Sequence, residues 1–214
     1  MSTSTFRVPI FQREYSWLED EVTEFWRDLQ GAQGEDPYFL GLVILTEEDG
    51  RKQIVDGQQR ILTLTLLAAA IYHEAVATKR NALADRIEAN FLRSIDYETD
   101  AITPRVILSD EEDNKALQHI LEHGLDGDVS TDAAGSASFA VHLKNAFLKL
   151  REQLRLDLDL DQFKRLGAWT EFLTNRLYFA VFVHPNAADA YRVYEVINTR
   201  GKELSTATFL RIMC

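Results

Sequence analysis

The sequence predicts an α+β fold, in which a small mixed β-sheet is joined to a larger helical part. Four short segments rich in β-branched and aromatic residues read as strands, at residues 6–10, 38–45, 52–56 and 176–184. The chain between the third and fourth segments repeats apolar residues at helical spacing. We therefore expect residues 1–75 and 176–214 to form one core, with residues 76–175 as a helical subdomain.

The expected core begins with alternating strands and helices. After the strand at 6–10, a helix is predicted over residues 19–30, where four apolar residues form one stripe: Val22, Phe25, Trp26 and Leu29. The acidic turn TEEDG joins the strands at 38–45 and 52–56 into a hairpin. Residues 61–77 are rich in Leu and Ala, which predicts a buried helix starting at the sequence DGQQR.

The middle of the chain is predicted to be mainly helical. We expect a helix over residues 81–95 and a short strand over residues 103–108. Ser109 and Glu112 have the spacing of a capping box, which predicts that Ser109 begins a helix reaching about His123. Two amphipathic helices follow, marked by Leu143, Phe147, Leu150 and Leu154, and by Phe163, Leu166, Phe172 and Leu173.

The remaining segments are a loop and the C-terminal elements. Residues 124–135 are predicted to be a flexible loop, because Gly, Asp, Ser and Thr replace any apolar period. Asn186 can cap a helix that Gly201 would end, and this helix would present Asn198, Arg200 and Lys202 at its C-terminal end. The chain stops inside a further apolar helix, residues 205–214, which we interpret as a truncation.

Composition restricts the function. The chain of 214 residues has a net charge of −11, which argues against a protein that coats DNA non-specifically through many cations. The single cysteine, Cys214, excludes an internal disulfide and a cysteine-based metal cluster. No signal peptide and no run of 18 apolar residues occurs, so we expect a cytoplasmic protein that does not enter a membrane.

The sequence DGQQR, Asp56–Arg60, places polar residues where a strand meets a helix. The first backbone N–H groups of a helix are unpaired, and a glycine turn lets an anion such as phosphate approach them. Arg60 could add donors to phosphate oxygens, while Gln58 or Gln59 could orient a water molecule. Asp56 could hold Mg²⁺ or polarise that water. The Walker and GxGxxG phosphate motifs are both absent.

A plain structural turn would explain DGQQR equally well if it stood alone. Two further clusters favour a site, because each places an arginine and an amide side chain at the end of an apolar element. One follows the first strand and contains Gln12, Arg13, Tyr15 and Trp17; the other contains Asn198, Arg200 and Lys202. We expect Arg13, Arg60 and Arg200 to face one cleft that a triphosphate can bridge. Tyr15 and Trp17 could also stack on a DNA base.

Four stretches resemble the N-terminal domain of GmrSD-type modification-dependent restriction proteins. They are VPIFQREYSW, YFLGLVIL, IVDGQQRILTL and YEVINTRGKELS, in that order, and DGQQR is the most specific. The same domain occurs in the phosphorothioate-sensing protein SspE and is described as ParB/sulfiredoxin-like. The resemblance implies an NTP-hydrolysing module that senses modified double-stranded DNA and controls an HNH-type nuclease domain absent from this fragment.

The resemblance also assigns residues. Asp56, Gly57, Gln58, Gln59 and Arg60 would be the nucleotide motif, with Gln12 and Arg13 in support, and Asn198, Arg200 and Gly201 closing the pocket. Lys202 would lie at its rim. This sequence departs from the family where Thr208 replaces an expected aspartate.

Two functions remain open. One is a Mg²⁺-dependent nucleoside triphosphatase, and the other is a non-hydrolysing reader of modified DNA that uses the nucleotide only as a regulatory ligand.

Overall fold

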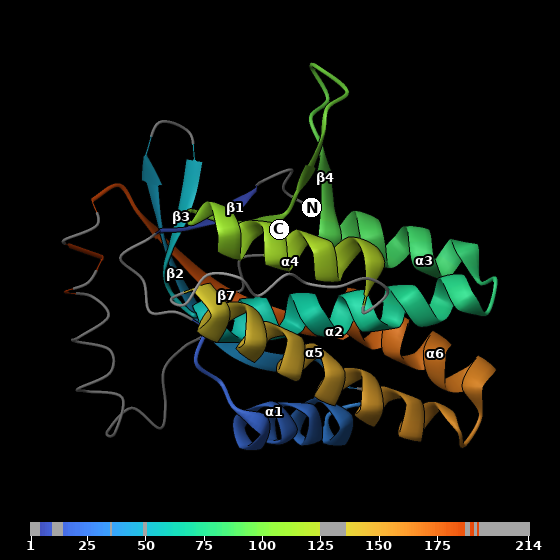
Figure 1. Cartoon of the computed structure of the whole chain (residues 1–214). Helices are drawn as coiled ribbons and strands as arrows, with labels where there is room; N and C mark the ends of the chain where they lie inside the picture. The colour runs from blue at the N-terminus through green and yellow to red at the C-terminus, as the bar shows by residue number, and fades with distance from the viewer. Residues whose placement is uncertain are drawn as a thin grey trace.

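The computed structural model describes residues 5–9, 15–34, 36–48, 51–124, 136–186, 189–190 and 192. Figure 1 shows a β-sheet at one end of the molecule and a group of long helices at the other. The elements in chain order are β1 (Phe6–Val8), α1 (Glu19–Gly31), β2 (Tyr38–Glu48), β3 (Arg51–Asp56), α2 (Gln58–Ala77), α3 (Asn81–Ile87), the π-helical turn η1 (Glu88–Leu92), β4 (Arg93–Ile95), β5 (Ile102–Pro104), β6 (Val106–Leu108), α4 (Glu111–His123), α5 (Ser136–Leu158), α6 (Gln162–Glu171), η2 (Phe172–Arg176) and β7 (Leu177–His184).

The main sheet confirms the predicted mixed architecture. Its strand order is β6-β1-β3-β2-β7, in which β2 and β3 are antiparallel and the other neighbours are parallel. The predicted hairpin is present, with Leu45 opposite Ile54 and Thr46 opposite Gln53. The sheet therefore joins strands from both ends of the described chain, and β7 pairs with β2 although more than a hundred residues separate them.

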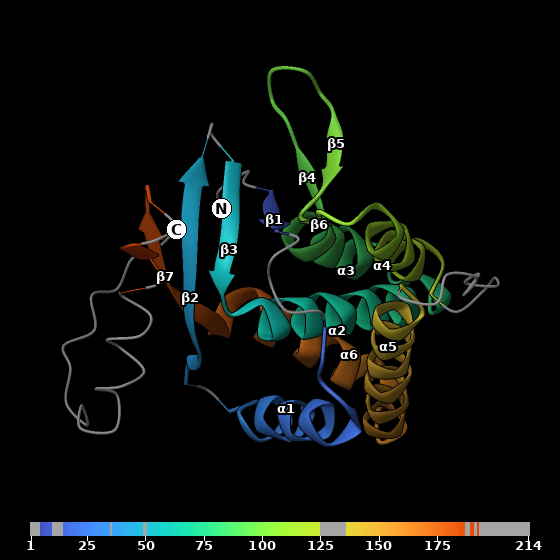
Figure 2. The same ribbon diagram turned by 60° about the vertical axis from the view of Figure 1, so that its left-hand side comes forward.

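The predicted helix over residues 81–95 is wrong in its last part. The helix ends at Ile87, a π-helical turn follows, and residues 93–95 form β4, which pairs with β5 in a separate two-stranded sheet. This sheet extends away from the body of the molecule (Figure 2). The cause is a hairpin pairing with the next strand, because Ile95 lies opposite Ile102, and the Arg105 guanidinium donates to the Ala89 carbonyl at 2.7 Å. The predicted strand at 103–108 is accordingly divided between β5 and β6.

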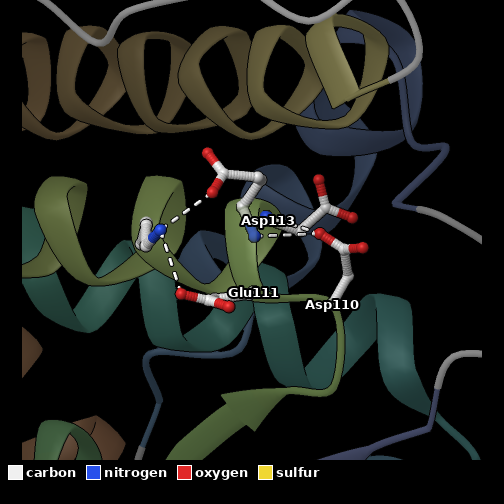
Figure 3. Close-up of polar contacts among 5 residues, drawn as sticks. Asp110, Glu111 and Asp113 are labelled. Atoms are coloured by element: carbon white, nitrogen blue, oxygen red, sulfur yellow. Dashed lines mark hydrogen bonds and ion pairs between the residues drawn. The ribbon is translucent and has the colours of Figure 1, made fainter.

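The predicted cap of α4 is displaced by one residue. Asp110, not Ser109, is the N-cap, and its Oδ1 atom accepts from the N–H groups of Glu112 and Asp113 at 3.0 Å (Figure 3). In a capping box the Ser109 N–H would donate to the Glu112 side chain. It donates instead to the Val8 carbonyl at 2.9 Å. A carboxylate at this position also interacts favourably with the helix dipole.

Helix α2 is the centre of the core. It lies between α3 and α4 on one side and α5 and α6 on the other (Figures 1 and 2). By length and composition α2 could cross a membrane, but 67% of its most apolar window is buried inside the protein, as in the core helix of a globular domain. The predicted helix is thus confirmed, and it begins three residues earlier, at Gln58.

A small second cluster covers the other face of the sheet. Ile44 of β2 and Val55 of β3 pack there with Ala190, which follows β7. The predicted cap at Asn186 is confirmed, because its Oδ1 atom accepts from the Asp189 N–H at 3.3 Å. Of the predicted loop at 124–135, only residue 124 is among the described residues.

Candidate functional site at the β3–α2 turn

The turn between β3 and α2 requires a glycine for two reasons. Gly57 is the N-cap of α2 and has a φ of +93°, in the left-handed region that side chains disfavour. A Cβ atom at this position would lie 3.1 Å from Val43 Cγ2 and 3.4 Å from the Leu42 carbonyl oxygen. The Asp-Gly pair thus lets the chain pass from strand to helix while in close contact with β2.

Two irregularities in the sheet lie beside this turn. Opposite β3, the register shifts so that Ile44 faces Asp56 and Leu45 faces Ile54, which leaves Val55 as the extra residue. Opposite β7, Phe39 and Gly41 face consecutive residues, which leaves Leu40 as the extra residue. Strand β2 also continues past the end of β3 (Figure 2). The Leu40 backbone is therefore released from the ladder next to the turn.

Arg60 uses the backbone that this bulge releases. Its Nη1 atom donates to the Leu40 carbonyl at 3.2 Å, and its Nη2 atom lies 3.8 Å from Asp56 Oδ2. Both side chains are 30% exposed, so the pair sits at the surface of the turn. The guanidinium is thereby folded back toward the start of its own helix.

Gly41 makes this position of Arg60 possible. It has a φ of +128°, and a Cβ atom there would lie 1.8 Å from Arg60 Nη1, a distance at which two atoms cannot coexist. Sequence reasoning did not identify Gly41 or the Leu40 carbonyl as parts of the site. The available signal was a glycine inside an apolar strand, which often marks a bulge or a close approach of another group.

The first turn of α2 has no acidic residue, and Gly57 offers no side chain to cap it. The two glutamines differ. Gln58 is buried, whereas the Oε1 atom of Gln59 accepts from the Ser16 N–H at 3.1 Å. Gln59 therefore ties the segment before α1 to the start of α2.

Tyr15 belongs to the core. It is 0% exposed, its hydroxyl is 2.8 Å from Thr63 Oγ1, and burial raises its pKa. Such a ring has no face open to a base, so the structure contradicts a stacking role for Tyr15. Trp17 is half-buried, and its ring centroid lies 5.7 Å from that of Phe25.

Comparison with protein families decides the classification. A family model described as "GmrSD restriction endonuclease, N-terminal domain" matches residues 1–212. The chain belongs to this family. A search of the curated proteins found no match. Membership in the GmrSD family places the chain in a restriction system, in which DNA is the substrate and a nuclease part does the cutting.

Several predicted site residues of this GmrSD domain lie outside the described residues: Gln12, Arg13, Asn198, Arg200, Gly201, Lys202 and Thr208. The shared cleft of Arg13, Arg60 and Arg200 thus stays a prediction, as do the proposed domain limits. The structure brings together Asp56, Gly57 and Arg60, and it adds Leu40 and Gly41.

Metal binding at this site would depend on a nucleotide. Within the described ranges, no group of three His, Cys, Asp or Glu residues is placed to hold a metal ion. Mg²⁺ is commonly held by one or two carboxylates together with substrate phosphates. The single carboxylate of Asp56 could therefore hold Mg²⁺ only together with the phosphates of a bound nucleotide.

Proposed function

We propose that this GmrSD N-terminal domain binds and hydrolyses a nucleoside triphosphate at the β3–α2 turn, senses modified DNA, and so controls the nuclease part of the restriction system. The observation that carries the proposal is the position of Arg60. Its guanidinium folds back over Gly41 to the start of α2, beside Asp56 and the uncapped first turn. Cationic donors and helix N–H groups at one place form an arrangement suited to phosphate.

The chemistry follows from charge. During phosphoryl transfer, negative charge builds up on the transferring group, and a fixed guanidinium stabilises it most in the transition state. Among the described residues, the Arg60 guanidinium donates one hydrogen bond, to Leu40, and its contact with Asp56 at 3.8 Å is longer than a hydrogen bond. Donors on Arg60 therefore remain for a phosphate.

Asp56 and Gln58 would complete the reaction. The Asp56 carboxylate would hold Mg²⁺ together with phosphate oxygens, and that ion would neutralise charge between the phosphates. Gln58 is the better candidate for orienting the attacking water, because the Oε1 atom of Gln59 already accepts from Ser16. Gln12, Arg13, Asn198, Arg200, Gly201 and Lys202 are proposed to surround the nucleotide, on the strength of the resemblance.

One observation favours the second function, a reader that binds nucleotide without hydrolysing it. The Gln59 Oε1 atom already accepts from the Ser16 N–H, so one of the two glutamines is engaged with the backbone and less available to orient a water molecule. In that case the turn would respond to nucleotide by moving the segment that carries Ser16.

Phosphate release decides between the two functions. We expect turnover of at least one of the four common NTPs with Mg²⁺, and a change in rate when modified duplex is added. In single-turnover reactions at saturating NTP, Arg60→Ala should reduce the rate by about 10²-fold. Lys144→Ala on α5 serves as a surface control. A wild-type rate for Arg60→Ala, with loss of DNA binding only, would assign the DGQQR turn to the DNA-reading surface instead.

A further inference from the structure

A pocket of about 490 Å³ lies between the start of α1 and the middle of α5, apart from the β3–α2 turn. Trp17 and Leu18 form one wall, and His142, Asn145 and Lys149 of α5 form the other. The three α5 residues recur at helical spacing, so they present one continuous stripe. The volume is within the usual range of small-molecule sites.

The charges of the pocket exclude a phosphate as its main ligand. Lys149 Nζ is 2.7 Å from Glu19 Oε1 and 3.3 Å from Glu152 Oε2, so two carboxylates face one ammonium group. The hydrogen bond to Glu19 raises the pKa of Lys149 and keeps it charged, yet its charge is already compensated. The first turn of α1 borders the pocket through Glu19 and also carries Asp20 and Glu21. An uncharged ligand is therefore favoured over an anion.

The polar groups of the pocket suit a heterocycle with both donors and acceptors. His142 Nδ1 is 3.1 Å from the Tyr15 carbonyl oxygen, which can only accept, so Nδ1 carries the hydrogen. In the neutral ring, Nε2 is then an acceptor, while the exposed Asn145 amide offers both a donor and an acceptor. The Trp17 indole supplies a flat apolar surface.

The pocket is connected to the proposed hydrolytic site through three consecutive residues. Trp17 directly follows Tyr15 and Ser16. The Ser16 N–H donates to Gln59 on α2, and the Tyr15 hydroxyl is hydrogen-bonded to Thr63 on the same helix. Figure 2 shows the segment that precedes α1 descending from beside α2 to the start of α1. A ligand that shifts Trp17 must therefore change the environment of the Ser16 N–H and of Gln59.

We propose that the α1–α5 pocket binds an uncharged nucleobase, and that its occupation acts on the first turn of α2 through Ser16 and Gln59. The base could come from a free nucleoside or from a nucleotide turned out of DNA. The effect on turnover rests on the proposed hydrolytic function, whereas base binding does not.

NMR of the nitrogen-15-labelled chain tests base binding without any hydrolysis assay. The chain has three tryptophans, so Trp17→Phe assigns the Trp17 indole N–H signal. Titration with adenosine, guanosine, cytidine and thymidine should shift this signal and the Ser16 amide signal with one shared Kd. Asn145→Ala should weaken binding about fivefold, because two hydrogen-bonding groups are lost. Val141→Ala, exposed one turn earlier on α5, should not change it.

Short single-stranded DNA with and without abasic sites separates the two sources of the base. A shift with the intact strand but not with free nucleosides assigns the pocket to DNA, and a shift with both assigns it to bases in general. An equal shift with fully abasic DNA, no saturable shift with any probe, or unchanged binding in Asn145→Ala would overturn the proposal. Arg60→Ala should keep base binding, so failure of the hydrolytic proposal would leave this result intact.

Discussion

Two aspartate–arginine pairs in this chain use the same chemistry in opposite ways. In the helical part, Asp157 is buried, with its side chain 3% exposed, and Arg165 donates to both of its carboxylate oxygens at 2.7 and 2.8 Å. Trp169 and Gln30 each add a hydrogen bond at 2.9 Å. At the β3–α2 turn, Asp56 and Arg60 are 3.8 Å apart, and each is 30% exposed.

The difference separates a pair that serves the fold from a pair that keeps capacity for a ligand. The Asp157 carboxylate accepts four hydrogen bonds and connects α1, α5 and α6, so its capacity to accept hydrogen bonds is used within the fold. The pair at the turn is loosely made and open to solvent, so both members keep capacity for a ligand. Residue types alone would not tell the two pairs apart as candidate sites. The number of hydrogen bonds that each pair already makes within the fold distinguishes them.

The largest effect is expected at the buried pair. Asp157→Ala leaves the Arg165 guanidinium and the Trp169 N–H without their acceptor, so the free energy of unfolding should fall by about 3–5 kcal/mol. Urea denaturation measures this, with the exposed Asp159→Ala as the matched control. A loss below about 1 kcal/mol would show that the two pairs do not differ in the way described here.

The next effect is expected at Arg60, and it should appear in the rate instead of in stability. Arg60→Ala should lower the free energy of unfolding by less than about 1 kcal/mol, because the ion pair is exposed. The loss of transition-state stabilisation should be about 3 kcal/mol in single-turnover hydrolysis. Asp56→Asn should in addition raise the Mg²⁺ concentration needed for half-maximal rate. Denaturation curves and phosphate release on the same samples provide both readings.

Gly41→Ala tests whether the bulge positions the arginine. A methyl group at Gly41 must displace Arg60 and also strains the backbone, so stability should fall by about 1–3 kcal/mol and the hydrolysis rate should drop with it. The rate losses of Gly41→Ala and Arg60→Ala should not add in the double variant, because both act on one guanidinium. Additive losses would mean that Gly41 affects the rate by another route. Gly31→Ala is the control, since nothing lies near its Cβ position.

The smallest effects should divide the two glutamines. Gln59→Ala removes the acceptor of the Ser16 N–H, so we expect a stability loss of about 1 kcal/mol. Gln58→Ala should lower the hydrolysis rate by at least about tenfold with little effect on affinity, if Gln58 orients the water. Thermal unfolding and single-turnover kinetics of both variants give the comparison, and a reversed pattern would exchange their roles.

Much of the fold could be predicted because it depends on local pattern. The strands near 38–45, 52–56 and 176–184, the stripe of α1 and the start of α2 at DGQQR all follow from periodicity and turn residues. The errors lie where a partner outside the local apolar pattern decided the outcome, whether in the next strand or far along the chain. Residues 93–95 became a strand because Ile102 pairs with Ile95, and Ser109 lost the cap because Val8 holds its N–H.

The candidate site divides in the same way. The sequence by itself determined the Asp-Gly turn, the uncapped start of α2 and the presence of Arg60, since these are properties of consecutive residues. Only the tertiary structure decided that Leu40 and Gly41 hold the arginine, that Gln59 is bound to Ser16, and that Tyr15 is buried against Thr63. These contacts join residues 19 to 48 positions apart, and no local pattern specifies which side chains a sheet and a helix bring together. The physical reason is that a side chain's free hydrogen-bonding capacity depends on its neighbours in space.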